Sequence, residues 1–190
     1  MTVSQFKTQA LKKLTVCSPS PQLDIEVLLE YCLKFSKTQL LLNHQKELST
    51  EEENWLTDAV LKREKGLPIA YITGHKEFFG IDFLVTPDVL IPKPDTEILV
   101  ERAIEIITQK MHSHPSSILT VCDMCTGSGC IAASLAKALP EAEIVASDIS
   151  IDALDVAQKN LNRICPGRVK LVQSDLFSNI NRKFDLILCI

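Results

Sequence analysis

The chain has 190 residues and is 46% hydrophobic, which gives enough apolar material for one large domain or two small ones. Its formal net charge is −4, so no basic excess gathers phosphates and broad nucleic-acid binding is disfavoured. No apolar run approaches the roughly 20 residues of a membrane span, and no signal peptide is evident. Seven cysteines without a secretory signal favour reduced thiols in the cytoplasm.

The first 75 residues are predicted to form a bundle of helices. Apolar residues recur there at helical spacing, and Ser36 is placed to cap a short helix that runs through Leu42. Thr50 and Glu53 match a capping box for a longer helix that ends at Gly66. The buried faces of the three longer helices are expected to carry Phe6, Ala10, Leu11 and Leu14, then Leu23, Val27, Leu28 and Tyr31, then Trp55, Val60 and Leu61.

After this bundle the apolar spacing changes from helical to alternating. Phe79, Ile81 and Phe83 alternate with small or polar residues, and residues 89–91 follow a turn at residues 86–88. This pattern predicts a β-hairpin.

A further helix is predicted to follow residues 91–94, whose two prolines keep the chain extended. Asp95 or Thr96 is placed to cap this helix, and its apolar face extends to Ile107. Residues 111–117 are predicted to form a polar loop.

Beyond that loop, strands and helices alternate. A β-α-β-α-β rhythm is typical of a parallel, doubly wound sheet, so the fold class is α/β. The ligands of such sheets bind beyond the carboxyl ends of the strands. Strands are predicted at residues 118–123, 143–148, 169–173 and 184–190, and helices at residues 131–139 and 152–162.

A glycine-rich turn follows the first of these strands. Glycine suits a turn in which the backbone must bend tightly into a helix and approach a ligand closely. Gly127, Gly129 and Ala132 satisfy the pattern G-x-G-x-x-A, and Asp148 lies downstream at a suitable distance to bind ribose hydroxyls. Taken alone, this pattern leaves NAD, S-adenosylmethionine and a purely structural turn open.

Acidic residues stand at three successive strand ends, where a ligand would lie. Asp123 ends the first strand, Asp148 ends the second, and Asp175 follows the third. Carboxylates can accept hydrogen bonds from a ribose diol and from an adenine amine, whereas NAD offers no evident role for an acid after the third strand. The three acids therefore favour S-adenosylmethionine and a methyltransferase.

Five short segments stand in an order that is found in one enzyme family. They are Pro68–Gly74, Glu77–Gly80, Leu90–Glu97, Asp123–Gly129 and Ser174–Phe177. Over nearly its whole length the chain resembles the PrmC/HemK family, the peptide-chain-release-factor glutamine N5-methyltransferases. The run Ile-Pro-Lys-Pro-Asp-Thr-Glu within the third segment is the specific part, because generic methyltransferases lack it.

The resemblance implies a three-part organisation. Residues 1–75 are expected to form a helical substrate-recognition domain, residues 76–94 a β-hairpin linker, and residues 95–190 the first half of a Rossmann-like S-adenosylmethionine-dependent methyltransferase domain. The implied partner is a peptide chain release factor, with no membrane and no direct nucleic-acid binding. The implied location is the cytoplasm.

Carried over position by position, the resemblance implies a cofactor site. Asp148 matches the acid that binds the ribose, and Asp175 and Leu176 match the contacts on the adenine side. The positions around the methionine part of the cofactor are Cys125, Thr126, Gly127, Ser128 and Gly129.

Two residues depart from the family pattern. Lys93 replaces the usual arginine, which keeps the charge but loses the planar fork. Cys125 occupies the position of the first glycine in the loop, so the backbone approach there is expected to be less demanding.

No catalytic residue is assigned in the chain. The family follows its fourth strand with Asn-Pro-Pro-Tyr, which the resemblance implies is the clamp that holds the substrate amide in line with the methyl group. Counted from Phe184, the asparagine position falls on Ile190 or just beyond it. The 190-residue chain is therefore expected to be inactive by itself and to expose an apolar, aggregation-prone strand edge.

Other interpretations stay open at this point. A nucleic-acid base N-methyltransferase shares the fold and the acceptor geometry, and a truncated product would be non-catalytic. No metal is expected, because Cys122, Cys125 and Cys130 have no fourth ligand nearby in the sequence.

Overall fold

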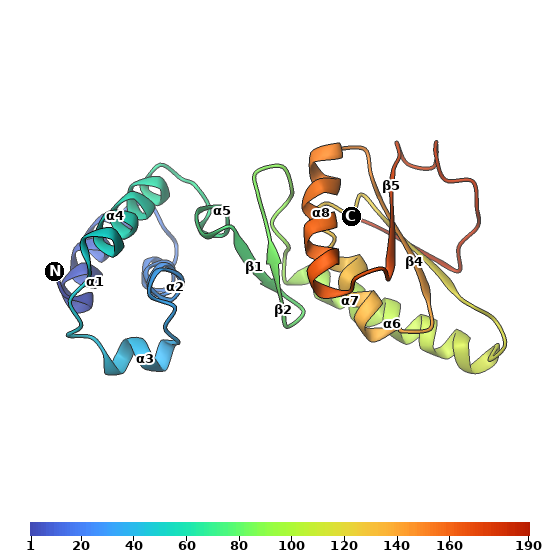
Figure 1. The fold of residues 1–190 in the computed structure, drawn as a ribbon, viewed down its shortest axis with the longest axis horizontal. Coiled ribbons are helices and arrows are strands. Elements are labelled where there is room, and N and C mark those ends of the chain that lie inside the picture. The colour runs from blue at the N-terminus through green and yellow to red at the C-terminus, as the bar shows by residue number, and fades with distance from the viewer. The chain divides into compact units, whose positions relative to one another are not determined.

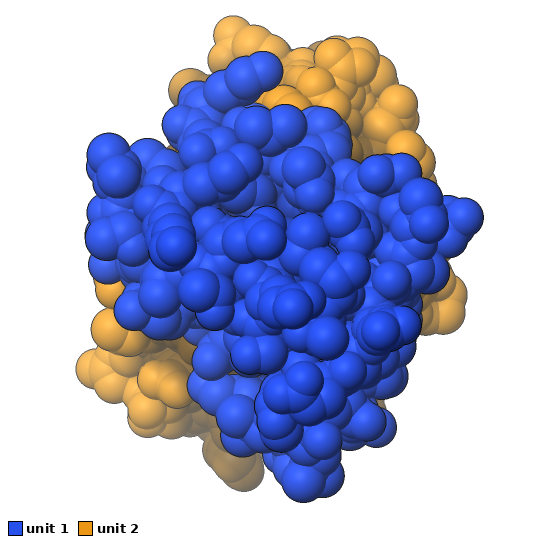
Figure 2. All heavy atoms as spheres, turned by 90° about the vertical axis from the view of Figure 1, so that its left-hand side faces the viewer, with its two compact units in different colours: residues 1–73 blue, residues 74–190 orange.

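The chain builds two separate hydrophobic cores. In the computed structural model, which describes residues 1–190, one core lies in the unit Met1–Thr73 and the other in the unit Gly74–Ile190. Figure 2 colours the first unit blue and the second orange. No helix of either unit is both long and apolar enough to cross a membrane. The division of the chain into three functional parts stays a prediction.

The first unit is all-helical, as predicted, and three of its helices begin with a capping box. Ser36 caps the third helix together with Gln39, which confirms the prediction. The prediction for the fourth helix is wrong by one residue, because Ser49 is the cap and Glu52 its partner. Glu53 instead accepts a hydrogen bond from the Met1 ammonium at 2.9 Å. The helices are α1 (Val3–Leu14), α2 (Pro21–Leu33), α3 (Lys37–Leu42), α4 (Thr50–Glu64) and α5 (Ile69–Thr73), as Figure 1 shows.

The buried faces of these helices agree only in part with the predicted ones. Phe6, Ala10 and Leu14 are buried on α1, as predicted. Leu23 and Leu61, however, are 57% and 43% exposed. In α2 apolar residues occur on nearly every side, so helical spacing alone does not select the face that packs. The buried residues of α2 are Asp24, Ile25, Leu28, Leu29 and Leu33.

One ion pair links α2 to α4 within this unit and is largely shielded from water. Arg63 Nε donates to Asp24 Oδ2 at 2.7 Å, and the Ser18 hydroxyl donates to the same oxygen at 2.7 Å. The side chains of Arg63 and Asp24 are only 16% and 10% exposed. Because each charge depends on the other for compensation, this pair constrains the packing of the two helices.

The second unit joins a β-hairpin to a parallel sheet and three helices. The hairpin strands are β1 (His75–Phe78) and β2 (Ile81–Leu84), which are antiparallel. The other elements, which can be followed in Figure 1, are α6 (Asp95–Ser113), β3 (Thr120–Met124), α7 (Cys130–Ala138), β4 (Glu143–Asp148), α8 (Ile151–Ile164), β5 (Val169–Gln173) and β6 (Leu186–Cys189).

The hairpin turns earlier than predicted. Its turn is the pair Phe79 and Gly80, whose φ angles are 53° and 69°, as the favoured two-residue hairpin turn requires. The Glu97 carboxylate accepts a hydrogen bond from the Phe79 N–H at 3.1 Å, and the Glu77 carboxylate accepts one from the Gly80 N–H at 2.6 Å. Residues 89–91 form no strand. The prediction that the hairpin pairs across residues 86–88 is therefore wrong.

Helix α6 also differs from the prediction at both ends. Pro94 is its N-cap residue, and no side chain caps the first turn, so neither Asp95 nor Thr96 has the predicted capping role. The helix continues through Ser113, into the stretch predicted as a loop. Its buried residues Val100, Ala103 and Ile107 recur at the helical spacing that predicted its core-facing side.

The parallel sheet has the strand order β5-β4-β3-β6. Residues of α6, α7 and α8 share one core with Val121, Ile144 and Leu188, so all three helices cover the same face of the sheet. On the opposite face, Cys122 and Met124 pack against a cluster that includes Ile180. The predicted parallel direction of the strands is thus confirmed. A doubly wound sheet would also have helices on both faces, whereas all three helices of this unit lie on one face.

This topology places a crevice at the carboxyl ends of β3 and β6. From β3 the chain moves outward to β4 and then β5, and it then returns to the other side of β3 as β6. The strand order therefore reverses between β3 and β6, and ligands of open α/β sheets bind at the carboxyl ends of the strands at such a point.

The ion pair of the first unit can be tested by removing its carboxylate. We expect Asp24→Ala to lower the free energy of unfolding by about 3 kcal/mol, because it leaves the shielded guanidinium of Arg63 without a counter-charge. Urea denaturation followed by the fluorescence of Trp55, the single tryptophan of the chain, measures this loss.

The matched control for this prediction is Asp58→Ala on α4. Asp58 pairs with Lys62 at 2.7 Å, but both side chains are more than half exposed, at 60% and 53%. Its loss is expected to cost at most about 0.5 kcal/mol. Equal effects of the two substitutions would contradict the role of the Asp24–Arg63 pair.

Candidate functional site

A cavity of about 140 Å³ lies at the carboxyl ends of β3 and β6, where the topology predicts a ligand. Five segments contribute to it: the loop between β3 and α7, the first turn of α7, the proline-containing segment before α6, the first turn of α6, and the residue that follows β6. The lining residues are Leu90, Ile91, Pro92, Lys93, Thr96, Cys125, Thr126, Gly127, Ser128, Cys130, Ile131 and Ile190.

The β3–α7 loop (Cys125–Gly129) has an unusual backbone conformation. Cys125, Gly127 and Gly129 have φ angles of 61°, 54° and 78°, in the left-handed region that L side chains rarely adopt. A Cβ at Gly129 would also lie 3.2 Å from the Cβ of Ala157 on α8. Glycine at position 129 is therefore required both by the backbone angle and by the close approach of α8.

Asp123 holds this loop from the end of β3. One of its carboxylate oxygens accepts hydrogen bonds from the Thr126 hydroxyl at 2.6 Å and from the Ala132 N–H at 3.1 Å. The side chain is almost fully buried, at 1% exposure. Burial raises the pKa of Asp123 to about 6, although the two hydrogen bonds partly counteract this effect. Asp123 is thus an internal support of the loop and does not line the cavity.

Asp148 holds the same loop from the end of β4. Its Oδ2 accepts a hydrogen bond from the Gly127 N–H at 2.9 Å, and its Oδ1 accepts one from the Ser150 N–H at 3.0 Å. A carboxylate has about four lone-pair positions, so each oxygen retains a position that can accept from a ligand. Asp148 is partly buried beside the loop but is not part of the cavity lining.

Asp175 and Leu176 lie on the surface after β5, also outside the cavity lining. The preceding Ser174 N–H donates to the Asp148 carbonyl at 3.0 Å, which links this turn to the end of β4. Leu176 is 54% exposed and has a φ of 46°. The structure therefore brings Cys125–Ser128 to the cavity and leaves Gly129, Asp148, Asp175 and Leu176 outside its lining. The assignment of these positions to parts of a cofactor stays a prediction.

Asn160 on α8 is a structural support of the site that sequence reasoning missed. Its side-chain amide donates to the carbonyls of Ser128 and Leu84, both at 2.9 Å, and its Oδ1 accepts from the Leu84 N–H at 2.8 Å. The residue is fully buried, so it ties the loop and the hairpin to one helix. The available signal was an amide on the apolar face of an amphipathic helix, next to Ala157 and Leu161.

The segment before α6 and the first turn of α6 contribute polar groups to the cavity. Lys93 and Thr96 both belong to the lining, and Lys93 is its only charged residue. Lys93 therefore faces the same space as the β3–α7 loop, although more than 30 positions separate Lys93 from Cys125 in the sequence.

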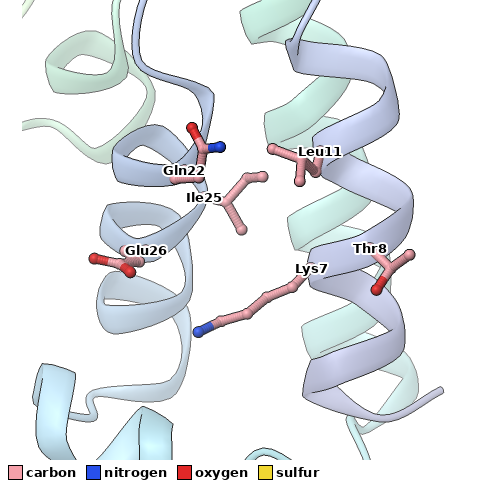
Figure 3. Close-up of a pocket in the computed structure, with 6 residues that line it drawn as sticks. All are labelled: Lys7, Thr8, Leu11, Gln22, Ile25 and Glu26. Carbon is pink, nitrogen blue, oxygen red and sulfur yellow. The ribbon is translucent and has the colours of Figure 1, made fainter.

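No group of three or more histidine, cysteine or acidic residues is arranged to hold a metal ion. A second hollow of about 200 Å³ lies between α1 and α2 in the first unit. Figure 3 shows Lys7 reaching from α1 toward α2, with Leu11 and Ile25 between the two helices. None of the predicted site residues lines this hollow.

The burial of Asp123 generates a prediction about pH. Its folded pKa of about 6 lies above the ordinary value of 3.8, so the folded protein binds this proton more tightly than the unfolded chain. The resulting stabilisation is fully present below the unfolded pKa and is lost as the pH rises through the folded one. This loss amounts to at most about 3 kcal/mol between pH 4 and 7.

We expect Asp123→Asn to remove this loss. The free energy of unfolding should therefore fall less steeply between pH 4 and 7 in this variant than in the unmodified chain. Urea denaturation followed by circular dichroism at four pH values measures the slope. Asp155→Asn, on the exposed side of α8, is the control. The same slope in the Asp123 variant and the unmodified chain would contradict the burial argument.

The role of Asn160 can be tested by replacing it with alanine, with the same replacement of Asn162 on α8 as the control. Asn160→Ala leaves one buried carbonyl, that of Ser128, and two partly buried backbone groups of Leu84 without their side-chain partner, which should cost about 3 kcal/mol. Asn162, which accepts from Gln158 on the exposed surface, is the control, and Asn162→Ala should change stability by less than about 0.5 kcal/mol. Hydrogen exchange of the Leu84 N–H should also accelerate in the Asn160 variant and not in the Asn162 variant. Unchanged exchange would contradict the proposed hydrogen bonds between Asn160 and the hairpin.

Comparison with known proteins assigns families to both units. Residues 5–74 match the PrmC N-terminal domain, and residues 99–189 match the methyltransferase small domain. The solved N-terminal domain of human METTL16 in complex with SAH has a TM-score of 0.47 at 20% identity, covering 78% of this chain and 56% of that chain. That likeness is too weak to assign a function or a ligand.

Curated relatives match nearly the whole chain. The release factor glutamine methyltransferase of Koribacter versatilis is 42% identical over 190 residues, which is 98% of this chain and 65% of the relative. The enzymes of the same name from Moorella thermoacetica and Buchnera aphidicola are 39% and 37% identical, over 94% and 98% of this chain and 62% and 65% of the relatives. The chain thus spans less than two thirds of the length of these relatives. Over nearly its whole length the chain is therefore similar to the release factor glutamine methyltransferases, and it combines a PrmC N-terminal domain with a methyltransferase small domain.

Proposed function

We propose that this protein uses S-adenosylmethionine to methylate the side-chain amide nitrogen of a glutamine in a peptide chain release factor. The observation that carries the proposal is the cavity at the carboxyl ends of β3 and β6. The β3–α7 loop lines it together with Lys93 and Thr96, which belong to the segment that sets the resembling family apart from generic methyltransferases. The names of the curated relatives support the same reaction and substrate.

The residues around this cavity fit the cofactor. A ligand-binding pocket for a drug-sized molecule occupies about 300–1,000 Å³, so a cavity of about 140 Å³ takes only one part of the cofactor. We assign the methionine part to the cavity, beside Cys125–Gly129. The ribose and adenine would then extend toward Asp148 and toward Asp175 with Leu176, which are the residues outside the lining.

The loop is suited to hold the methionine part of such a ligand, and Asp148 is suited to hold its ribose. The absence of a Cβ at Gly127 leaves the backbone open to a close approach, since no neighbouring atom lies within 4 Å of that position. The free lone pairs of Asp148 can accept from the ribose diol while its other lone pairs fix the Gly127 and Ser150 N–H groups. Ligand binding and loop geometry therefore depend on the same carboxylate.

When bound, S-adenosylmethionine supplies a methyl group on a positively charged sulfur. The residues of this chain need to hold that group still, because methyl transfer is governed by the alignment of the attacking nitrogen with the methyl carbon. No residue of the chain is assigned to the glutamine amide. The expectation that the 190-residue chain alone does not methylate stays a prediction.

The release factor is the proposed partner, and the helical N-terminal region is proposed to help hold it. Translation termination is then the process that the modification serves, and the cytoplasm is the place where this substrate occurs. No observed feature specifically favours a nucleic-acid base as the acceptor, and the net charge of −4 gives no basic surface excess for it.

A transfer assay tests the proposed reaction. Methyl-labelled S-adenosylmethionine is incubated with a release factor and with two proteins. One is the 190-residue chain, and the other continues after Ile190 with the part of the Koribacter versatilis relative that follows the matched region. We expect label on a glutamine of the release factor from the extended protein, and no label when that glutamine is replaced by asparagine. Label on nucleic acid instead of the release factor would overturn the proposal.

Cofactor binding by the chain itself is predicted to depend on Asp148. Losing charge-assisted hydrogen bonds costs about 1.5–3 kcal/mol, so Asp148→Ala should weaken binding of S-adenosylmethionine at least about tenfold. Calorimetric titration measures the affinity. Asp155→Ala, on the exposed side of α8, is the control and should bind as the unmodified chain does. An unchanged affinity in the Asp148 variant would refute the ribose assignment.

A further inference from the structure

Two exposed cysteines meet at the edge of the cavity. Cys189 ends β6 and pairs in register with Met124 of β3, and Cys125 follows Met124 directly. Paired strands lie about 4.8 Å apart and successive Cα atoms 3.8 Å apart, so the Cα atoms of Cys125 and Cys189 are separated by about 6 Å. This separation lies within the range of about 4.4–6.8 Å that a disulfide bridges.

The two thiols also interact directly. Burial raises the pKa of the Cys125 thiol, and the charge and the hydrogen bond of Cys189 raise it further. Both cysteines are free and exposed to solvent. Because the thiolate is the reactive form, the raised pKa keeps Cys125 in the thiol form near neutral pH, and the resting state of the pair is the dithiol.

The neighbouring cysteines do not share these properties. Cys122 and Cys130 are buried, and burial raises the pKa of their thiols to about 11 and about 12. Cys17 is exposed but lies in the other unit, where its thiol faces backbone carbonyls at the end of α1. Cys125 and Cys189 are therefore the cysteines that combine exposure with a partner thiol.

We propose that Cys125 and Cys189 form a disulfide by exchange with a small-molecule disulfide such as oxidised glutathione, and that this bond fixes the width of the cavity at that edge. One cysteine gives up its proton and attacks the glutathione disulfide, which forms a mixed disulfide and releases one glutathione. The other cysteine then attacks the mixed disulfide and releases the second glutathione. The pair loses two electrons and two protons, and oxidised glutathione is reduced to two thiols.

The effect on the cavity follows from the residues that line it. Cys125 belongs to the lining, and so does Ile190, which follows Cys189 directly. In a disulfide the two Cβ atoms lie about 3.8 Å apart, so the bond holds the start of the loop and the end of β6 at one fixed separation, and the two segments can no longer move apart around a ligand. The bond should therefore weaken cofactor binding, and this consequence rests on the proposed function. In the resembling family the position of Cys125 holds a glycine, which could not form the bond.

Mass spectrometry tests bond formation without reference to the cofactor. The chain is incubated with oxidised glutathione at pH 8, free thiols are then blocked by alkylation, and the tryptic peptides are sequenced. We expect a link between Cys125 and Cys189 within one chain, no such link in Cys189→Ser, and an unaltered link in Cys17→Ser. A dithiol that stays reduced, stable glutathione adducts, or links only between chains would overturn the proposal.

Calorimetric titration with S-adenosylmethionine tests the effect on the cavity. We expect the oxidised chain to bind at least fivefold more weakly than the reduced chain. Cys189→Ser should bind equally well after either treatment. A disulfide that forms and leaves the affinity unchanged would overturn the proposed effect of the bond on the cavity. If the reduced chain does not bind the cofactor, the proposed function fails, and the peptide experiment still decides whether the disulfide forms.

Discussion

Carboxylates at two strand ends hold the β3–α7 loop in a backbone conformation that most side chains avoid. Asp123 accepts hydrogen bonds from Thr126 and Ala132, and Asp148 accepts one from Gly127. Between these anchors, the chain adopts left-handed φ angles at three of five positions. Each such angle is costly for a residue with a side chain, so the conformation depends on these surrounding hydrogen bonds.

The position of the loop depends in turn on the sheet. Parallel strands present their carboxyl ends at one edge of the sheet, and the strand order reverses there between β3 and β6. Asn160 then fixes the loop carbonyl of Ser128 and the backbone of Leu84 to α8. The hairpin, the helix and the loop thus form one connected support for the cavity, and Thr126, Gly127 and Ser128 of the lining are hydrogen-bonded to it.

Much of the second unit could be predicted because its signals are strong and local. The strands Glu143–Asp148 and Val169–Gln173 begin and end at the predicted residues, because the helix cap Ser150 follows the first closely and a turn at Gly167 precedes the second. The loop itself was predicted from its glycines, and Gly129 has both the positive φ and the close neighbour that make glycine necessary.

The remaining errors have physical causes that a single sequence does not display. Ser49 and Thr50 are equivalent capping residues, and the choice between them depends on Glu52 and on a distant ammonium that binds Glu53. The hairpin turn at Phe79 is stabilised by the carboxylate of Glu97, which lies 18 positions further along the chain. The buried face of α2 is selected by the other helices of the bundle, because α2 itself is apolar on nearly all sides.

We propose that the β3–α7 loop and its two anchoring carboxylates form the binding site for S-adenosylmethionine. Hydrogen–deuterium exchange of the chain with and without this ligand tests this proposal, because it locates the site without requiring methyl transfer. We expect slower exchange in the loop, in the first turn of α7 and at Ser150, with no change between α1 and α2. Protection confined to the hollow between α1 and α2, or no protection at saturating ligand, would contradict it.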